Sequence, residues 1–255
     1  MRALFFAKPR INQNMKRPFL LFVALFFLCL SLRAQPVKIL LVTGGHAYDT
    51  TAFFQLFDAL PGIGYRHMAQ PSANEAIAAG NVKKFDVLVF YDMWKTISEK
   101  EKQAYLDLTR EGKPLLFLHH SLASYQEWPE FEQMAGGKYI EKGPGISPRE
   151  ASTFNHDVWV DIEIAGQDHP VTRGLDDFRL FDEVYGNFRV SPKVRPLLKT
   201  DHPESSPVIG WVNRYNASSI VYLQPGHDSH AYGSTPYRTI LANAIRWLSS
   251  GRQEE

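Results

Sequence analysis

Four loops of this chain place polar side chains directly after runs of apolar residues. They carry Gly44-Gly45-His46, Asp92, His119-His120-Ser121 and Gly226-His227-Asp228. Neutral imidazoles give and take protons near pH 7, and they also bind metal ions well. An apolar run followed by histidine therefore indicates acid–base or metal chemistry. We expect a nearby carboxylate, Asp228 or Asp157, to orient one of the rings.

Other kinds of site fit these loops less well. Gly44-Gly45 lacks the third glycine of a dinucleotide fingerprint and the lysine of a P-loop, so we expect its amides to approach a ligand anion or hydroxyl. Ser121 does not lie in the Gly-x-Ser-x-Gly pattern of a serine hydrolase. A divalent metal stays open as a cofactor, but no two histidines have helical i, i+4 spacing, so only the folded chain could assemble its ligands.

The elements that carry these loops alternate between strand and helix. Continuous apolar runs, typical of strands buried on both faces, occupy residues 37–43, 85–91 and 114–118. Helical spacing is found in three places. The first is residues 49–60, and the second begins at the capping box Ser98-Glu-Lys-Glu101. The third is a final helix that Pro236 opens. This alternation predicts an α/β fold with a parallel sheet, where ligands bind outside the carboxyl ends of the strands. We therefore expect the histidine loops to share one cleft.

Residues 136–190 interrupt the alternation. They are rich in glycine, proline and aspartate, and they include Val158–Ile164, whose alternating pattern is typical of a half-exposed antiparallel edge strand. We expect an inserted antiparallel segment that lies over the sheet. The chain has no repeat and no linker, so we predict one α/β domain over residues 37–250.

Several longer motifs resemble the ThuA-like (trehalose utilisation) family. They include HHSLASY at 119–125, HDV at 156–158, HPVTRGL at 169–175, DE at 182–183 and YLQPGHD at 222–228. The resemblance covers nearly all of residues 37–249. It implies the flavodoxin-like fold of the class I glutamine amidotransferase-like proteins, a parallel sheet with helices on both faces.

The resemblance also implies that glutamine chemistry has been lost. Amidotransferases carry a nucleophilic cysteine after the strand that corresponds to residues 114–118, and here His119 stands at or next to that position. What remains is a pocket lined with imidazoles, and aromatic rings such as Tyr125 could stack on a sugar face. We predict catalytic roles for His119, His120, His227 and Asp228. We predict substrate contacts for Gly45, His46, Asp92, Ser121, Tyr125 and His156.

The first 34 residues have the composition of a secretory signal peptide. Basic residues precede the apolar run Phe19–Leu32, which is short for a membrane span and ends near a weak cleavage site at Ala34. The only cysteine, Cys29, lies in this run, so the mature chain has no thiol for glutamine hydrolysis. Removal of six basic residues leaves 22 basic and 27 acidic ones, a net charge of −5, and no basic patch that would favour nucleic acid.

These observations predict a secreted or periplasmic protein that acts on trehalose, a related glycoside or a keto derivative by acid–base chemistry. The alternative is a sugar-binding or accessory protein without turnover. Elimination, hydration and isomerisation fit the residues, whereas no pair of glycosidase carboxylates can be recognised. A small sugar is the expected partner, no stable membrane span is expected, and the oligomeric state is left open.

Overall fold

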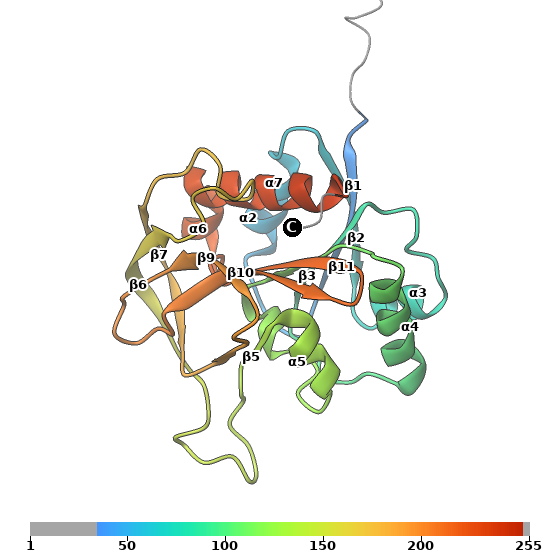
Figure 1. Ribbon diagram of the computed structural model, residues 1–255, viewed down its shortest axis with the longest axis horizontal. Coiled ribbons are helices and arrows are strands. Elements are labelled where there is room, and N and C mark those ends of the chain that lie inside the picture. Colours follow the sequence, from blue (N-terminus) through green and yellow to red (C-terminus); the bar gives the residue numbers. More distant parts are fainter. Residues whose placement is uncertain (1–34, 252–255) are drawn as a thin grey trace, which may run out of the picture. The chain divides into compact units, whose positions relative to one another are not determined.

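A nine-stranded sheet organises the protein, whose computed structural model describes residues 35–251 (Figure 1). The strand order is β2-β1-β3-β4-β11-β10-β9-β6-β7. The parallel half contains β1 (Val37–Gly44), β2 (Ile63–Ala69), β3 (Val87–Asp92), β4 (Leu115–Leu118) and β11 (Ser218–Leu223). The predicted α/β class with a largely parallel sheet is confirmed. The predicted signal peptide lies outside the described residues.

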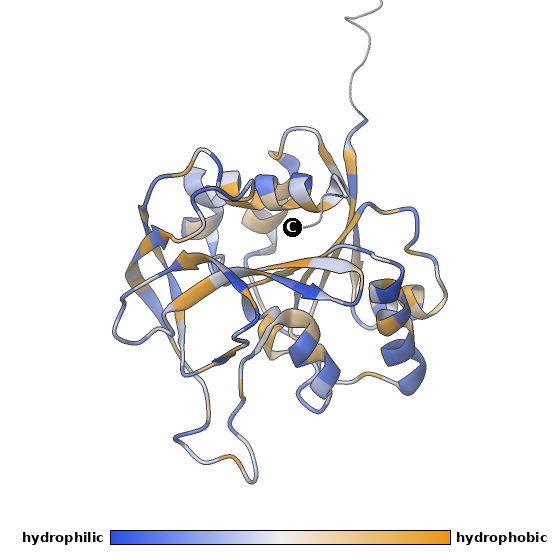
Figure 2. Cartoon of the chain, in the orientation of Figure 1, coloured by the Kyte–Doolittle hydropathy of each residue, from blue (hydrophilic) through white to orange (hydrophobic). Residues whose placement is uncertain are grey.

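Helices cover both faces of the sheet (Figure 1). One face packs against α2 (Thr50–Asp58), α6 (Ser229–Gly233) and α7 (Thr235–Ser249). The other packs against α3 (Ser72–Ala78), α4 (Glu99–Arg110) and α5 (Pro129–Ala135). Alternate strand residues supply the two cores: Ile39 and Leu41 face the first group, while Leu40 and Val42 face the second. Every residue of β3 and β4 is buried, and all except Asp92 at the end of β3 are apolar or aromatic (Figure 2).

Local signals set the helix ends. In α4, the Ser98 side chain accepts from the Glu101 amide and the Glu101 carboxylate accepts from the Ser98 amide, which completes the predicted capping box. The final helix α7 begins with Pro236 in its first turn and is capped by the side chain of Ser234. Because β1, β3, β4 and β11 run parallel, the loops that follow them emerge at the same edge of the sheet.

The predicted antiparallel segment is present, but its position differs from the prediction. The antiparallel half of the sheet contains β10 (Val208–Tyr215), β9 (Arg195–Lys199), β6 (Thr153–Ile164) and β7 (Phe178–Gly186). β6 is therefore neither the edge strand nor part of a layer above the sheet, because it pairs with both β9 and β7 and extends the same sheet. Its alternation arises because Val160, Ile162 and Ile164 face the core. An alternating pattern shows only that one face of the strand is buried. An inner strand can have one buried face as well as an edge strand.

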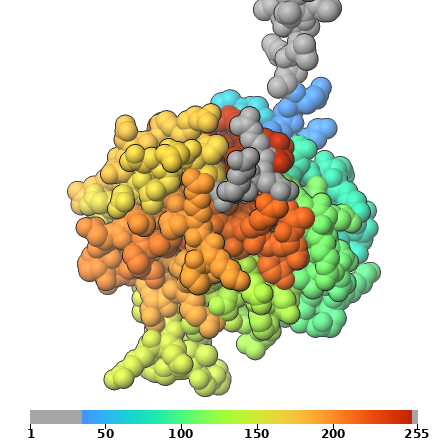
Figure 3. Space-filling model, in the orientation of Figure 1, coloured from blue at the N-terminus to red at the C-terminus, as the bar shows by residue number. Residues whose placement is uncertain are grey.

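A smaller sheet joins β5 (Gly137–Lys138) to β8 (Arg189–Val190). The loop between β5 and β6 projects away from the sheet (Figures 1 and 3). Between residues 35 and 251, no helix combines the length and apolarity that crossing a membrane requires.

Candidate functional site

Four histidine rings from three strand-end loops meet at one edge of the sheet. His46 follows β1, His119 and His120 follow β4, and His227 follows β11. The ring centroids of His46 and His120 are 4.7 Å apart, those of His119 and His120 5.3 Å, and those of His119 and His227 5.4 Å. The structure thus brings these rings together as expected for the carboxyl edge of a parallel sheet.

His119 has an unusual backbone and a fixed ring. It opens the short 3-10 helix η2 (His119–Ala123) with a φ of 51°, a left-handed conformation that is uncommon outside glycine and costs free energy. Its ring is fully buried, and Nδ1 lies 2.7 Å from the backbone oxygen of Gln224. Because a carbonyl oxygen only accepts, Nδ1 carries a proton, and when the ring carries no second proton Nε2 presents a lone pair.

Glu183, which comes from β7, meets this lone pair. Its Oε2 lies 2.9 Å from His119 Nε2 and 3.1 Å from His227 Nδ1, and the two nitrogens are 3.3 Å apart. The Tyr185 hydroxyl lies 2.8 Å from the same His119 nitrogen. We call His119, Glu183 and His227 the His–Glu cluster. Two imidazoles and a carboxylate are a donor set that could hold a metal ion.

The charges of the His–Glu cluster reinforce one another. Burial raises the pKa of the Glu183 carboxyl, but the hydrogen bonds and charges of the two histidines lower that pKa further, well below its usual range. The hydrogen bond to Glu183 in turn raises the pKa of His227 above its ordinary value. Glu183 is therefore a carboxylate near neutral pH, and His227 holds a proton more readily than an isolated histidine.

His120 has the opposite character. Its side chain is buried between the rings of Tyr91 and His46, and neither ring nitrogen makes a hydrogen bond of good geometry within residues 35–251. Burial, followed by the nearby charges of His119 and His46, lowers its pKa well below the ordinary value. His120 is therefore neutral at pH 7, with unused hydrogen-bonding capacity beside the cluster.

A cavity of about 610 Å³ opens beside these residues. His46, His120, Glu183 and Tyr185 line one part of it. The loop between β5 and β6 and the start of β6 contribute others, which are Tyr139, Glu141, Lys142, Ser152, Thr153 and Phe154. This volume and the mixture of apolar and polar groups suit a small organic ligand. Phe154 is 62% exposed and presents its ring to solvent at this cavity.

Of the six predicted substrate contacts, only His46 lies in the lining of the cavity, and three of the other five are buried side chains. Asp92 and Tyr125 are buried together around Gln70, whose Nε2 lies 2.8 Å from Asp92 Oδ2 and 3.2 Å from the Tyr125 hydroxyl. At 2% exposure the Tyr125 ring has no free face for a ligand. Ser121 is also fully buried. Sequence position places these residues near strand ends, but all three side chains are buried and none lines the cavity.

The remaining predicted residues have other partners. Met93's backbone oxygen occupies the space beside Gly45, so this glycine serves close packing between loops. Asp228 caps α6 and pairs with His230 at 3.0 Å, and it does not join the cluster. Asp157 pairs with His156, whose exposed ring stacks 6.0 Å from that of His227.

The sequence did not identify Glu183 as the orienting carboxylate. Glu183 lies within a strand of the antiparallel half, where no apolar-run-then-polar pattern points to it. Its neighbour Asp182 has a supporting role, because its carboxylate accepts from the amides of Gly226 and His227 at 2.8 and 2.9 Å. The only signal in the sequence was the Asp-Glu pair among the family motifs.

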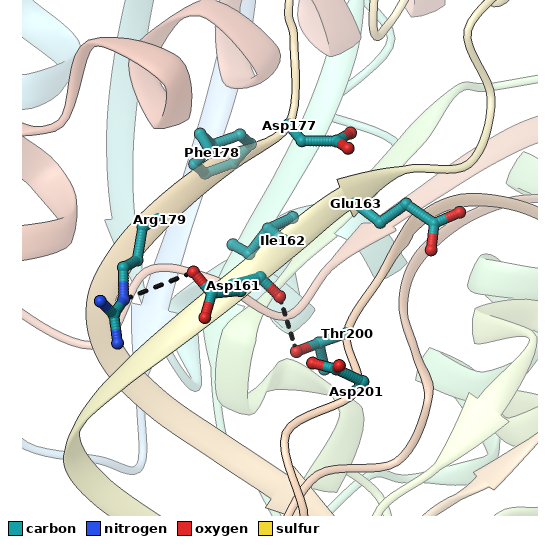
Figure 4. A pocket seen from close by; sticks show the side chains of 8 residues that line it. All are labelled: Asp161, Ile162, Glu163, Asp177, Phe178, Arg179, Thr200 and Asp201. Atoms are coloured by element: carbon teal, nitrogen blue, oxygen red, sulfur yellow. Dashed lines mark hydrogen bonds and ion pairs between the residues drawn. The ribbon is translucent and has the colours of Figure 1, made fainter.

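A second cavity, of about 580 Å³, lies on the antiparallel half of the sheet (Figure 4). Asp161, Glu163, Asp177, Arg179 and Asp201 contribute its charged groups, and Arg179 pairs with Asp161 at 3.4 Å. None of the clustered histidines lines this second cavity. We therefore place the candidate site at the histidine-lined cavity.

Fold and site together define a flavodoxin-like α/β protein whose strand-end pocket is lined by imidazoles. The model of the ThuA family, described as trehalose utilisation, matches residues 38–248. The chain therefore belongs to the ThuA family, which is associated with trehalose utilisation. Among proteins with curated descriptions, none matches the chain in sequence.

Solved structures support the same fold. A ThuA-like protein from Parabacteroides merdae is 17% identical, with a TM-score of 0.68 over 86% of this chain and 92% of its own. One from Bacteroides uniformis is 20% identical, with a TM-score of 0.64 over 86% and 94%. A β-galactosidase from Bacillus circulans sp. alkalophilus is 11% identical, with a TM-score of 0.53 over 86% of this chain but 32% of its own. At these identities the likeness concerns the fold alone.

Proposed function

We propose that this protein acts on a sugar, namely trehalose, a related glycoside or a keto derivative of one, by acid–base chemistry in the histidine-lined cavity. One observation carries the proposal. Glu183 contacts two imidazoles at the wall of a cavity of about 610 Å³, beside a third, buried imidazole that forms no hydrogen bond of good geometry with the described residues. Such an arrangement places groups of different proton affinity within reach of one ligand.

The two kinds of imidazole suit opposite halves of a proton transfer. His120 is neutral and can accept a proton, whereas His227, stabilised as a cation by Glu183, can donate one. Elimination, hydration and isomerisation of a sugar ketone each require a proton to leave one atom and another to reach a second atom. We assign the accepting role to His120 and the donating role to His227.

The rest of the cavity suits a sugar. The exposed ring of Phe154 and the half-buried ring of Tyr139 offer apolar faces, on which the C–H face of a pyranose can pack. Glu141 and Lys142 offer charged groups for hydroxyl groups. Phe154 and Tyr139 thus replace Tyr125 as the proposed aromatic contacts.

The proposal includes export from the cytoplasm. The basic start and the apolar run Phe19–Leu32 support a signal peptide, and the mature chain would begin near Gln35. A sugar from outside the cell would then be the natural ligand.

A panel of trehalose, other disaccharides and their keto derivatives tests the proposal. Proton NMR of each sugar with the protein over hours reports turnover, and calorimetry reports binding. We expect at least one keto sugar to be converted. Binding without conversion would favour the sugar-binding alternative. If no sugar of the panel were bound or converted, that result would contradict the proposal.

A further inference from the structure

We infer that the His–Glu cluster is a binding site for one divalent transition-metal ion of the zinc class. The site deepens the proposed function, because an ion there would face the same cavity. It is carried by the arrangement of three ligand atoms, which are His119 Nε2, Glu183 Oε2 and His227 Nδ1.

The separations of these atoms match the edges of a metal's coordination shell. Ligands bound at about 2.0–2.2 Å are about 2.9 Å apart when they subtend a right angle at the ion and about 3.4 Å apart in a tetrahedron. The three observed separations are 2.9, 3.1 and 3.3 Å. All three therefore fall in the range that one shared ion produces.

Hydrogen bonds alone do not readily satisfy the three ligand atoms of the His–Glu cluster. Nδ1 of His119 donates to the Gln224 carbonyl at 2.7 Å, so Nε2 of the neutral ring is a lone pair that faces the carboxylate oxygen of Glu183. Two lone pairs at 2.9 Å repel each other unless a proton or a metal ion lies between them, and the Tyr185 hydroxyl, 2.8 Å from Nε2, has only one proton to donate. A bound cation would satisfy both, together with the His227 nitrogen.

The surroundings also resemble those of metal-binding histidines. The ring nitrogen that does not face the metal is usually held by a carbonyl or a carboxylate, as Gln224 holds Nδ1 of His119. On the other side, two backbone amides are bound by Asp182, which fixes the loop that presents His227. Both ligand rings are thus oriented before an ion arrives.

An ion could reach the cluster and act in the cavity. The His227 side chain is 29% exposed, while Glu183 lines the cavity itself. Three protein ligands leave a position for a substrate oxygen, as in catalytic zinc sites. An ion there would replace the proton that His227 shares with Glu183, would polarise a sugar carbonyl or hydroxyl in place of the proton donated by His227, and would leave proton transfer to His120.

Calorimetric titration of the chelator-treated protein with zinc chloride tests the inference without any sugar. We expect one equivalent to bind to the unaltered protein, and Glu183→Gln and His227→Ala to weaken binding by about 10²-fold or more, since each removes a direct ligand. His230→Ala is the matched control, because His230 also pairs with a carboxylate but lies outside the cluster. This variant should bind zinc like the unaltered protein.

Thermal unfolding of each variant keeps the test decisive. Glu183→Gln changes a buried side chain, so if it fails to fold, the partly exposed His227 carries the comparison. Absence of zinc binding by the unaltered protein, or equal affinity in all folded variants, would overturn the inference. Such a result would not contradict the proposed function, which the sugar panel tests separately. A protein that binds zinc but converts no sugar would contradict only the proposed function.

Discussion

The position of Glu183 changes what the neighbouring histidines can do. A lone histidine beside a strand end titrates near its ordinary pKa, but here one carboxylate stabilises the charged form of His227 while burial keeps His120 neutral. Two imidazoles of the same residue type thus acquire opposite proton affinities a few ångströms apart. Their difference comes from partners and burial, neither of which the sequence displays at those positions.

Asp92 gives a test at the scale of one residue. Burial raises its pKa from the ordinary 3.8 to about 7, although Gln70 donates to it. Between pH 4 and pH 7 the unfolded chain loses this proton while the folded protein keeps it, so this residue makes the free energy of unfolding fall as pH rises. We therefore compare the free energy of unfolding of Asp92→Asn with that of the unaltered protein. This difference should shift in favour of the variant by up to about 4 kcal/mol between pH 4 and pH 8.

Urea unfolding of both proteins at the two pH values measures this difference. Asparagine keeps an oxygen that can accept from Gln70, so the substitution mainly removes the titrating group. A stability difference that is the same at pH 4 and pH 8 would show that Asp92 is not protonated in the folded state at neutral pH.

At the scale of elements, the loop after β1 depends on Gly45. Its φ is 82°, and a Cβ atom there would meet the backbone oxygen of Met93. Gly45→Ala should lower the free energy of unfolding by about 2 kcal/mol or more, because it combines backbone strain with a collision. Gly64→Ala, in β2, is the control, since nothing lies within 4 Å of its added carbon.

Thermal or urea unfolding of the two variants distinguishes them directly. We expect Gly64→Ala to stay within about 0.5 kcal/mol of the unaltered protein. Equal stability of both variants would mean that the loop after β1 moves freely, and the placement of His46 beside His120 would then lose its support.

Some elements could be predicted from the sequence and others could not. The strands at 87–92 and 115–118 are buried on both faces, so their apolar runs identify them without ambiguity. The helix Ser72–Ala78 has few large apolar residues to show a period, and it was not predicted. Strand Phe178–Gly186 carries Asp182 and Glu183 facing the site, so its polar residues interrupt the apolar pattern that would reveal it.

The candidate site divides in the same way. The histidine loops follow apolar strands of the parallel half, so a general rule about strand ends brings their rings together. Glu183 and Tyr185 reach the site from the antiparallel half, and only the folded sheet shows that β7 lies near the carboxyl ends of β4 and β11. Asp92, the last residue of β3, and Tyr125, which comes after η2, also lie near strand ends, yet both side chains are buried around Gln70 and neither lines the cavity.

At the scale of the whole molecule, export is the prediction that remains open. The intact mass of the protein recovered from outside the cytoplasm should correspond to a chain that begins near Gln35. Loss of the first 34 residues would also remove the only cysteine, so this species should release no ammonia from glutamine. A recovered mass that includes Phe19–Leu32 would contradict cleavage.

The central claim is that the His–Glu cluster acts on a sugar in the cavity beside it. Its most direct test is the rate at which the unaltered protein, Glu183→Gln and His230→Ala convert the keto derivative of trehalose, followed by proton NMR. We predict that Glu183→Gln lowers kcat by about 10²-fold or more, the usual size of an acid–base contribution, and that His230→Ala does not. Equal rates in all three proteins, or conversion by none, would contradict the claim.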